Sequence, residues 1–194
     1  MKRLAIVLLS LVVISGCTSE PNQPEQKPEP PEVITGRSAF QKLYVSAHGW
    51  APDAKPYQLQ SQVVGNNNGV DGKAVVWHAA FTSPSQGKSR SYVWSGTDSP
   101  DAPSRGVTPG TQDNYTPGNA FDVNFLKIDS DKAYEVAQKH GGEKITGTPV
   151  TYLLDWASGE NKLVWHVIYG ASRSDAKLTL DVDATTGIFI RKEH

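Results

Sequence analysis

The chain has 194 residues, of which 38% are hydrophobic, 9% aromatic and 20% charged, and its formal net charge is −1. This balance is typical of a globular protein and excludes the strong positive charge of a nucleic-acid-binding protein. The length allows one domain or two small ones. Cys17 is the single cysteine, which excludes an internal disulfide and any multi-cysteine metal site.

Residues 1–16 have the pattern of a secretory signal peptide. Lys2 and Arg3 form a positive region, and an apolar run follows over residues 4–14. This run is too short to span a membrane, which takes about 20 apolar residues, and it fits the apolar region of an export signal. The sequence Ile14-Ser15-Gly16-Cys17 then resembles the lipobox of bacterial lipoproteins. The resemblance implies that Cys17 is lipidated and becomes the mature N-terminus.

The alternative is a plain signal peptide that a chance cysteine happens to follow. Lipidation would hold the chain in a bacterial membrane, because two or more acyl chains such as palmitate anchor a protein stably. Thr18 stands where the lipoprotein resemblance requires Asp for retention at the inner membrane. We therefore expect the outer membrane, with the protein facing the periplasm.

Residues 17–34 are predicted to form a disordered linker. Between Thr18 and Glu32 prolines alternate with Glu and Gln, and no apolar side chain occurs. Such a segment cannot bury enough apolar surface to offset the entropy lost on ordering. It is expected to form an extended tether.

Three blocks of similar sequence then occur twice in the same order. The first pairs Ser38…His48-Gly49 with Ser130…His140-Gly141, and the second pairs Pro56-Tyr57-Gln58-Leu59 with Pro149-Val150-Thr151-Tyr152. The third pairs Val75-Val76-Trp77-His78-Ala79 with Leu163-Val164-Trp165-His166-Val167. Because the length changes fall in loops, the pattern predicts an internal duplication, with units at 35–128 and 129–194.

Each unit is predicted to begin with a helix and to continue as strands. Ser38 and Ser130 are candidate N-caps, and Gly49 and Gly141 follow as candidate C-caps. After each helix apolar residues alternate with period two, as in half-buried strands.

The first unit is expected to contain a long insertion over residues 95–119. Trp94 ends its third predicted strand, and Phe121 to Phe125 alternates like the fourth. A loop of this length inside a compact domain is usually functional or disordered.

The fold class is therefore α+β, with two tandem units that each hold one helix and a four-stranded antiparallel sheet. A helix covers one face of such a sheet, and the other face must be solvated, covered by the sister unit or offered to a partner. Units this small are expected to associate. If the free faces pack together, the binding surface consists of loops and edges, and if they diverge it is a concave aromatic saddle.

The second unit resembles the PepSY domain, a cystatin-like helix-and-sheet module. The resemblance is carried by Asp131 to Ala137, by Trp165-His166-Val167 and by the turn Val182-Asp183-Ala184-Thr185-Thr186-Gly187. It covers residues 129–191 directly and 38–98 only through the duplication. It implies a non-enzymatic module of bacterial envelope proteins and protease propeptides, with a proposed role in peptidase inhibition. Two tandem units also resemble the beta-lactamase inhibitory protein in outline.

His78 and His166 occupy equivalent positions on predicted strands. They are either sheet-face residues that bond to a neighbour or a paired site, should the two sheets meet by pseudo-symmetry. No HExxH, GxSxG or Walker motif occurs, and Cys17 is committed to lipid. We therefore expect no catalytic set, no metal and no cofactor.

Aromatic residues suggest both a core and a surface. Trp77 and Trp165 are predicted to fill the core, whereas Arg90, Tyr92 and Trp94 lie in a polar run and are candidates for binding a partner. The leading hypothesis is a lipid-anchored, non-catalytic envelope protein that binds another protein, with a peptidase as a candidate partner. The alternatives are a carrier of a small apolar or aromatic ligand in a cleft between the units, and an enzyme of unknown type.

Overall fold

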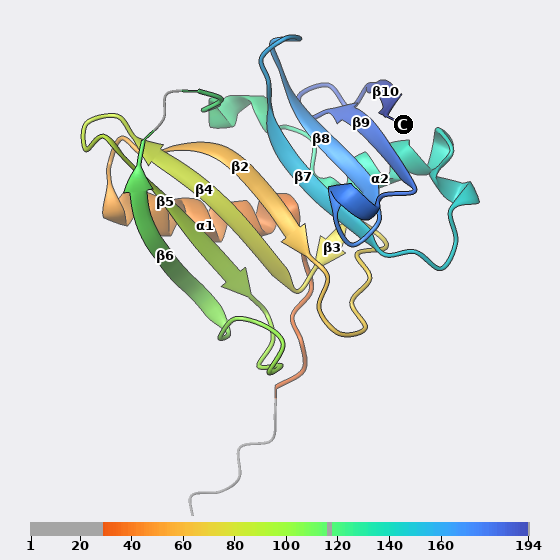
Figure 1. Cartoon of the computed structure of the whole chain (residues 1–194), viewed down its shortest axis with the longest axis horizontal. Helices are drawn as coiled ribbons and strands as arrows, with labels where there is room; N and C mark the ends of the chain where they lie inside the picture. Colours follow the sequence, from red (N-terminus) through yellow and green to blue (C-terminus); the bar gives the residue numbers. More distant parts are fainter. Residues whose placement is uncertain (1–28, 116–117, 194) are drawn as a thin grey trace, which may run out of the picture.

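A computed structural model describes residues 29–115 and 118–193. The predicted signal peptide and Cys17 lie outside the described residues. Mixed helix and antiparallel sheet, as predicted, make up the described part (Figure 1).

Eight strands form one antiparallel sheet in the order β10-β9-β8-β7-β2-β4-β5-β6. Their bounds are β2 Lys55–Gln62, β4 Val76–Ser83, β5 Lys88–Ser95, β6 Gly106–Asn114, β7 Val150–Ala157, β8 Lys162–Tyr169, β9 Leu178–Asp183 and β10 Phe189–Glu193. Two short strands, β1 (Ile34–Thr35) and β3 (Lys73–Ala74), pair separately.

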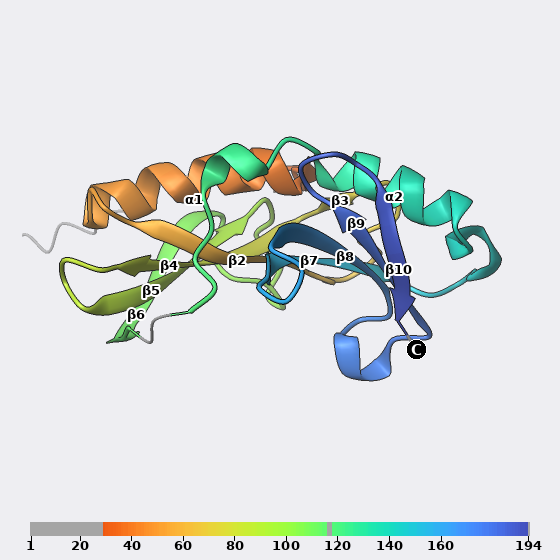
Figure 2. The ribbon, with the colours of Figure 1, turned by 90° about the horizontal axis from the view of Figure 1, so that it is seen from above.

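Two helices, α1 (Gly36–Trp50) and α2 (Ser130–Lys139), lie on the same side of this sheet (Figure 2). Short 3-10 turns occur at η1 (Val123–Phe125), η2 (Gly142–Lys144) and η3 (Arg173–Asp175). In the chain α1 precedes β2, β4, β5 and β6, and α2 precedes β7 to β10.

The two sets of four strands meet edge to edge through β2 and β7. Leu59 lies opposite Leu154 in this pairing, with Gln58 opposite Asp155 and Gln60 opposite Leu153. The two sets of strands therefore join through backbone pairing of strand edges and not through the free faces of the sheet. Since both helices cover one side, the whole opposite side of the sheet faces away from them.

The prediction of the fourth strand of the first unit was wrong. The fourth strand is β6, inside the predicted 95–119 insertion, and Phe121 to Phe125 instead forms a connection that contains η1. Phe121 is buried against Phe40 of α1, with 6.4 Å between ring centroids, whereas Phe125 is 42% exposed, so the first apolar residue of this segment belongs to the core. β6 is polar and contains Pro109, which an edge strand tolerates because one side of its backbone pairs with no neighbour.

The other part of the predicted insertion, residues 95–105, binds the first described segment of the chain, residues 29–34. Arg105 donates from Nη2 to the carbonyl oxygens of Glu29 and Pro30, at 3.1 and 3.2 Å, and its Nε lies 2.8 Å from Asp98 Oδ2. The amide of Glu32 donates to the Gly96 carbonyl at 2.8 Å. Residues 29–34 are therefore fixed to the domain. The predicted linker, 17–34, was given too late an end, because its last six residues belong to the folded part.

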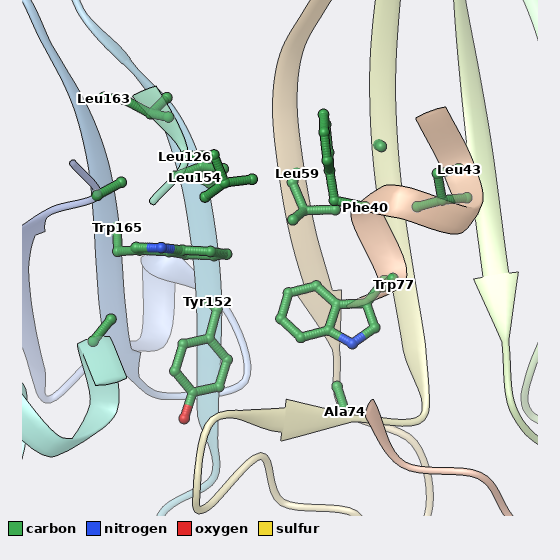
Figure 3. Close-up of a cluster of buried hydrophobic side chains, with 14 of the residues drawn as sticks. Phe40, Leu43, Leu59, Ala74, Trp77, Leu126, Tyr152, Leu154, Leu163 and Trp165 are labelled. Atoms are coloured by element: carbon green, nitrogen blue, oxygen red, sulfur yellow. The ribbon is translucent and has the colours of Figure 1, made fainter. Parts of the chain in front are cut away.

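The core centres on Trp77 of β4 and Trp165 of β8, both fully buried (Figure 3). Their ring centroids lie 6.5 Å apart in an edge-to-face arrangement, and Tyr152 lies 6.1 Å from Trp77. Each indole Nε1 donates to a backbone carbonyl just before a helix, that of Ile34 at 3.1 Å and that of Ile128 at 2.9 Å. The two indoles thus satisfy their polar atoms and position both helix starts.

The two helices begin against each other, and neither begins at its predicted N-cap. The N-cap positions are Thr35 and Asp129, before the predicted Ser38 and Ser130. The Asp129 carboxylate accepts from the amides of Arg37, at 2.8 Å, and Ser130, at 2.7 Å, so it caps both helices. This contact across 92 residues explains why α1 starts early, because its free N–H groups are satisfied by the start of α2.

Gly36 lies directly on the two indoles, and this generates a stability prediction. A Cβ at residue 36 would stand 2.6 Å from Trp165 Cη2 and 3.0 Å from Trp77 Cη2, whereas a Cβ at Gly49 of the same helix would meet nothing within 4 Å. We expect Gly36→Ala to lower the free energy of unfolding by about 1–3 kcal/mol through overpacking. Gly49→Ala should raise it by about 0.5–1 kcal/mol, because Ala is the better helix former. Urea denaturation of both variants tests this, and equal effects would contradict the described packing.

Candidate functional site

The side of the sheet away from the helices differs between its two halves. On β8 and β9, Val164, His166, Ile168 and Asp181 are at most 3% exposed. The loop that carries η3 lies on this side of the sheet (Figure 2), and Arg173 of η3 contacts Glu193 of β10. This half of the face is therefore closed by the protein itself.

The other half remains open within the described part of the chain. We define the uncovered face as the central outward side chains of β2, β4, β5 and β6 that are exposed or half-buried: Gln58, Gln60, Gln62, His78, Ala80, Ser89, Ser91, Val93 and Thr108. These nine side chains carry no fixed charge, and charged side chains lie at one end of the face, where Asp113 of β6 is exposed opposite Ser89 and Lys55 of β2 is exposed opposite Thr82. Strand pairing on both sides of β2, β4 and β5 holds their backbones in place.

A buried charge cluster lies beside this face and centres on His166. Its Nδ1 is 2.6 Å from Asp181 Oδ1 on β9, and its Nε2 is 3.2 Å from Asp155 Oδ1 on β7. Burial lowers the pKa of His166, but hydrogen bonds to Asp155 and Asp181 and their negative charges outweigh burial and raise the pKa to about 9. The imidazole is therefore protonated on both nitrogens at neutral pH.

Two arginines extend the charge cluster to the C-terminal strand. Arg191 Nη2 lies 2.8 Å from Asp181 Oδ2, and Arg191 also pairs with Glu160. Arg173 Nη2 lies 2.6 Å from Glu193 Oε2. Burial raises the pKa of Glu193, yet the hydrogen bond and charge of Arg173 lower it overall. The cluster thus ties β7, β8, β9, β10 and η3 together.

The charge cluster does not fit a metal site. His166, Asp181 and Glu193 offer ligand atoms that lie within 4.8 Å of one another. However, the guanidinium groups of Arg191 and Arg173 already neutralise the two carboxylates that a metal would require. The same geometry leaves neither nitrogen of His166 free to act as a general base. The arrangement can stabilise the strands, and it has the chemistry of a buried ion-pair network.

His78 and His166 are not brought together as a paired site. His78 lies opposite Gln60, Gln60 opposite Leu153, and Leu153 opposite His166, so the two imidazoles share a face and a row. Three interstrand steps of ~4.8 Å separate them by ~14 Å. His78 Nε2 lies 2.7 Å from Gln62 Oε1, and burial lowers the pKa of His78. Each histidine therefore bonds to a neighbour, and the predicted pair does not form.

The predicted partner-binding residues are also corrected. Tyr92 and Trp94 are each 3% exposed, because these alternate positions of β5 face the helices. Arg90 remains half-buried, with its guanidinium 5.6 Å from the Tyr92 ring centroid and its Nε donating to the Gly110 carbonyl at 3.0 Å. These residues hold β6 and the core in place, and the exposed residue of this strand is Ser91.

Sequence reasoning missed the partners of His166. Asp155, Asp181 and Arg191 lie on three strands, and only the registers of β7, β8, β9 and β10 bring them to one place. The only sign of these partners in the sequence was a polar residue at alternate positions of otherwise apolar strands. Such a pattern usually indicates a solvated face of a sheet and so does not by itself reveal a buried cluster.

Comparisons with known proteins give one likeness. No family model matches the chain, and no curated protein matches it. The crystal structure of a candidate lipoprotein from Clostridium difficile 630 matches with a TM-score of 0.54 and 13% sequence identity, over 87% of this chain and 95% of that chain. At this identity the likeness concerns the fold alone, which that protein shares over nearly its whole length. Among the residues that the structure describes, no helix combines the length and apolar character needed to cross a bilayer.

The charge cluster predicts a stability that depends on pH. The folded-state pKa of His166, about 9, exceeds its ordinary value of 6.5. Its contribution to stability is therefore complete below pH 6.5 and is lost as pH rises through about 9, with a magnitude on the order of 3 kcal/mol. Urea denaturation between pH 6.5 and about 9 should show a falling free energy of unfolding in the unmodified protein and in the control variant His78→Gln. His166→Gln should not show this fall. Parallel curves for the unmodified protein and His166→Gln would contradict the assignment.

Proposed function

We propose that the chain is a lipid-anchored bacterial envelope protein that binds another protein through the uncovered face and catalyses no reaction. The observation that carries this proposal is the uncovered face itself, a rigid and partly open sheet surface whose central side chains are uncharged and whose charged neighbours, Asp113 and Lys55, lie at one end. The centres of protein interfaces are depleted of charge in the same way. A surface fixed by strand pairing also loses little conformational entropy on binding.

The chemistry of the uncovered face defines the partner. Amides and hydroxyls such as Gln60, Ser91 and Thr108 offer hydrogen bonds without charge, and Ala80 and Val93 supply apolar contact. Burial lowers the pKa of His78, so the imidazole also stays neutral at neutral pH. We infer that the partner is a folded protein that presents an uncharged polar surface. A peptidase is the class implied by the PepSY resemblance.

We interpret residues 35–128 and 129–194 as two tandem PepSY-like units. Trp77 and Trp165 support this interpretation, since each lies on the second strand of its half on the main sheet. Each indole also donates to the carbonyl two residues before the helix of its half. The chain order of one helix followed by four strands of the main sheet, found twice, agrees with it.

The absence of catalysis is inferred from His166, whose two nitrogens both face carboxylates. The lipid anchor is inferred from the Ile14-Ser15-Gly16-Cys17 sequence, and Thr18 favours the outer membrane. That the protein of similar fold is a candidate lipoprotein agrees with this class.

Site-specific photo-crosslinking in the native cell tests the uncovered face. A crosslinking residue at Ser91 should give a discrete protein adduct, and one at Gln41, which is exposed on α1, should not. Adding Gln60→Arg to the Ser91 probe should reduce the adduct about tenfold or more, because an unpaired charge would be buried at the interface. Adding Gln41→Arg should leave it unchanged. Equal adducts from both probe positions, or none from Ser91, would refute the proposed face.

Lipid attachment is tested separately at Cys17. Labelled palmitate should be incorporated into the unmodified chain, and the chain should sediment with membranes. Cys17→Ser should abolish both, because the acyl chains supply the membrane affinity. A Cys17→Ser protein that still sediments with membranes would contradict the lipid anchor.

A further inference from the structure

A groove of about 420 Å³ lies between the two halves of the chain, with α2 on one side. The first half contributes Val70, from the segment between β2 and β3. The second half contributes Tyr134 and Gln138 of α2, Glu143 and Ile145 beyond it, and Tyr169 at the end of β8. This volume lies within the range of about 300–1,000 Å³ found for small-molecule sites.

The walls of the groove are tied together by buried hydrogen bonds. The amide of Val150 donates to the Asn68 carbonyl at 2.7 Å, and the Tyr152 hydroxyl donates to the Gly69 carbonyl at 2.6 Å. Gly69 has φ +69°, and a Cβ there would stand 1.8 Å from the Val150 carbonyl oxygen. The groove is therefore preformed, which lowers the entropic cost of binding.

One part of the groove is polar and carries a single negative charge. Tyr169 accepts from Gln138 Nε2 at 2.9 Å, and burial raises the pKa of both Tyr169 and Tyr134, so both phenols are neutral. Glu143, which is exposed at the rim, is the one charged side chain among the lining residues. Its Oε2 accepts from the Gly141 amide at 3.1 Å, and no ion pair joins it to a cation within the described ranges. Lys177 bonds to Thr148 instead.

Another part of the groove is apolar. Val70 is 43% exposed, one of five exposed large apolar side chains among the described residues, and Ile145 is half-buried. Covering these side chains would remove apolar surface from water. A carboxylate that lines a groove together with aromatic rings attracts an ammonium group through charge, and the rings can add cation–π contact. The groove therefore combines recognition of a cation with recognition of an apolar body.

We propose that this groove binds a small organic amine, with its ammonium group at Glu143 and its apolar part against Val70 and Ile145. This site lies apart from the uncovered face and does not depend on protein binding there. The proposal agrees with the alternative function predicted from the sequence, binding of a small apolar or aromatic ligand between the two units.

The probes are 2-phenylethylamine and its neutral analogue 2-phenylethanol. Each is titrated into the whole mature chain (residues 17–194) carrying Cys17→Ser, and backbone amide shifts are followed by NMR. The amine should shift amides within residues 68–70 and 143–150 and should bind at least about tenfold more tightly than the alcohol. Glu143→Gln should weaken binding of the amine about tenfold, which corresponds to about 1.4 kcal/mol, and should leave binding of the alcohol within about twofold.

Glu135→Gln is the matched control, because Glu135 lies on α2, pairs with Lys132 at 2.7 Å and does not line the groove. This variant should bind the amine as the unmodified chain does. Val70→Asn should weaken both probes by removing apolar contact. The proposal is overturned if the groove amides do not move, if both probes bind equally, or if Glu135→Gln weakens the amine as much as Glu143→Gln does.

Discussion

The contact between the two helix N-termini is the constraint on which the rest of the structure depends. Asp129 caps α1 and α2 together, and Ser130 Oγ accepts from the Gly36 amide at 2.7 Å and donates to the Gly72 carbonyl at 2.6 Å. These groups lie over Trp77 and Trp165, whose indoles hold the chain just before each helix. A helix start buried without such partners would leave unpaired N–H groups. Each half of the chain therefore provides hydrogen-bond partners for the other at the point where the two helices begin.

This junction also decides which side of the sheet is free. Because α1 and α2 start from one point and lie on one side, β2 and β7 can pair edge to edge and extend a single sheet (Figure 2). The opposite side is then closed on β8 and β9, where His166 is fixed between Asp155 and Asp181. It stays open on the four strands of the first half. The same arrangement thus gives one half an ion-pair network and leaves the other half an open sheet surface.

The position of β6 and the environment of His166 could not be predicted from the sequence. Phe121 to Phe125 alternates as a strand does, yet Phe121 packs against Phe40 of α1 and Phe125 lies near Trp156. β6 is polar and forms because β5 offers it a free edge. His78 and His166 are equivalent in sequence, but their protonation differs because carboxylates flank only His166. Local periodicity describes one segment at a time, and it cannot show which strand provides a partner across the sheet.

The sequence by itself determined both helices, most strands of the sheet and the burial of Trp77 and Trp165, because burial imposes periods of 3.6 and 2 on neighbouring residues. It also supplied the lipobox resemblance, which depends on a short contiguous motif. The tertiary structure alone decided that the halves join edge to edge, that Tyr92 and Trp94 are buried, and that His166 meets two carboxylates. These features depend on strand register and on contacts between residues far apart in the chain, and a one-residue change in register would reverse the face that each side chain occupies.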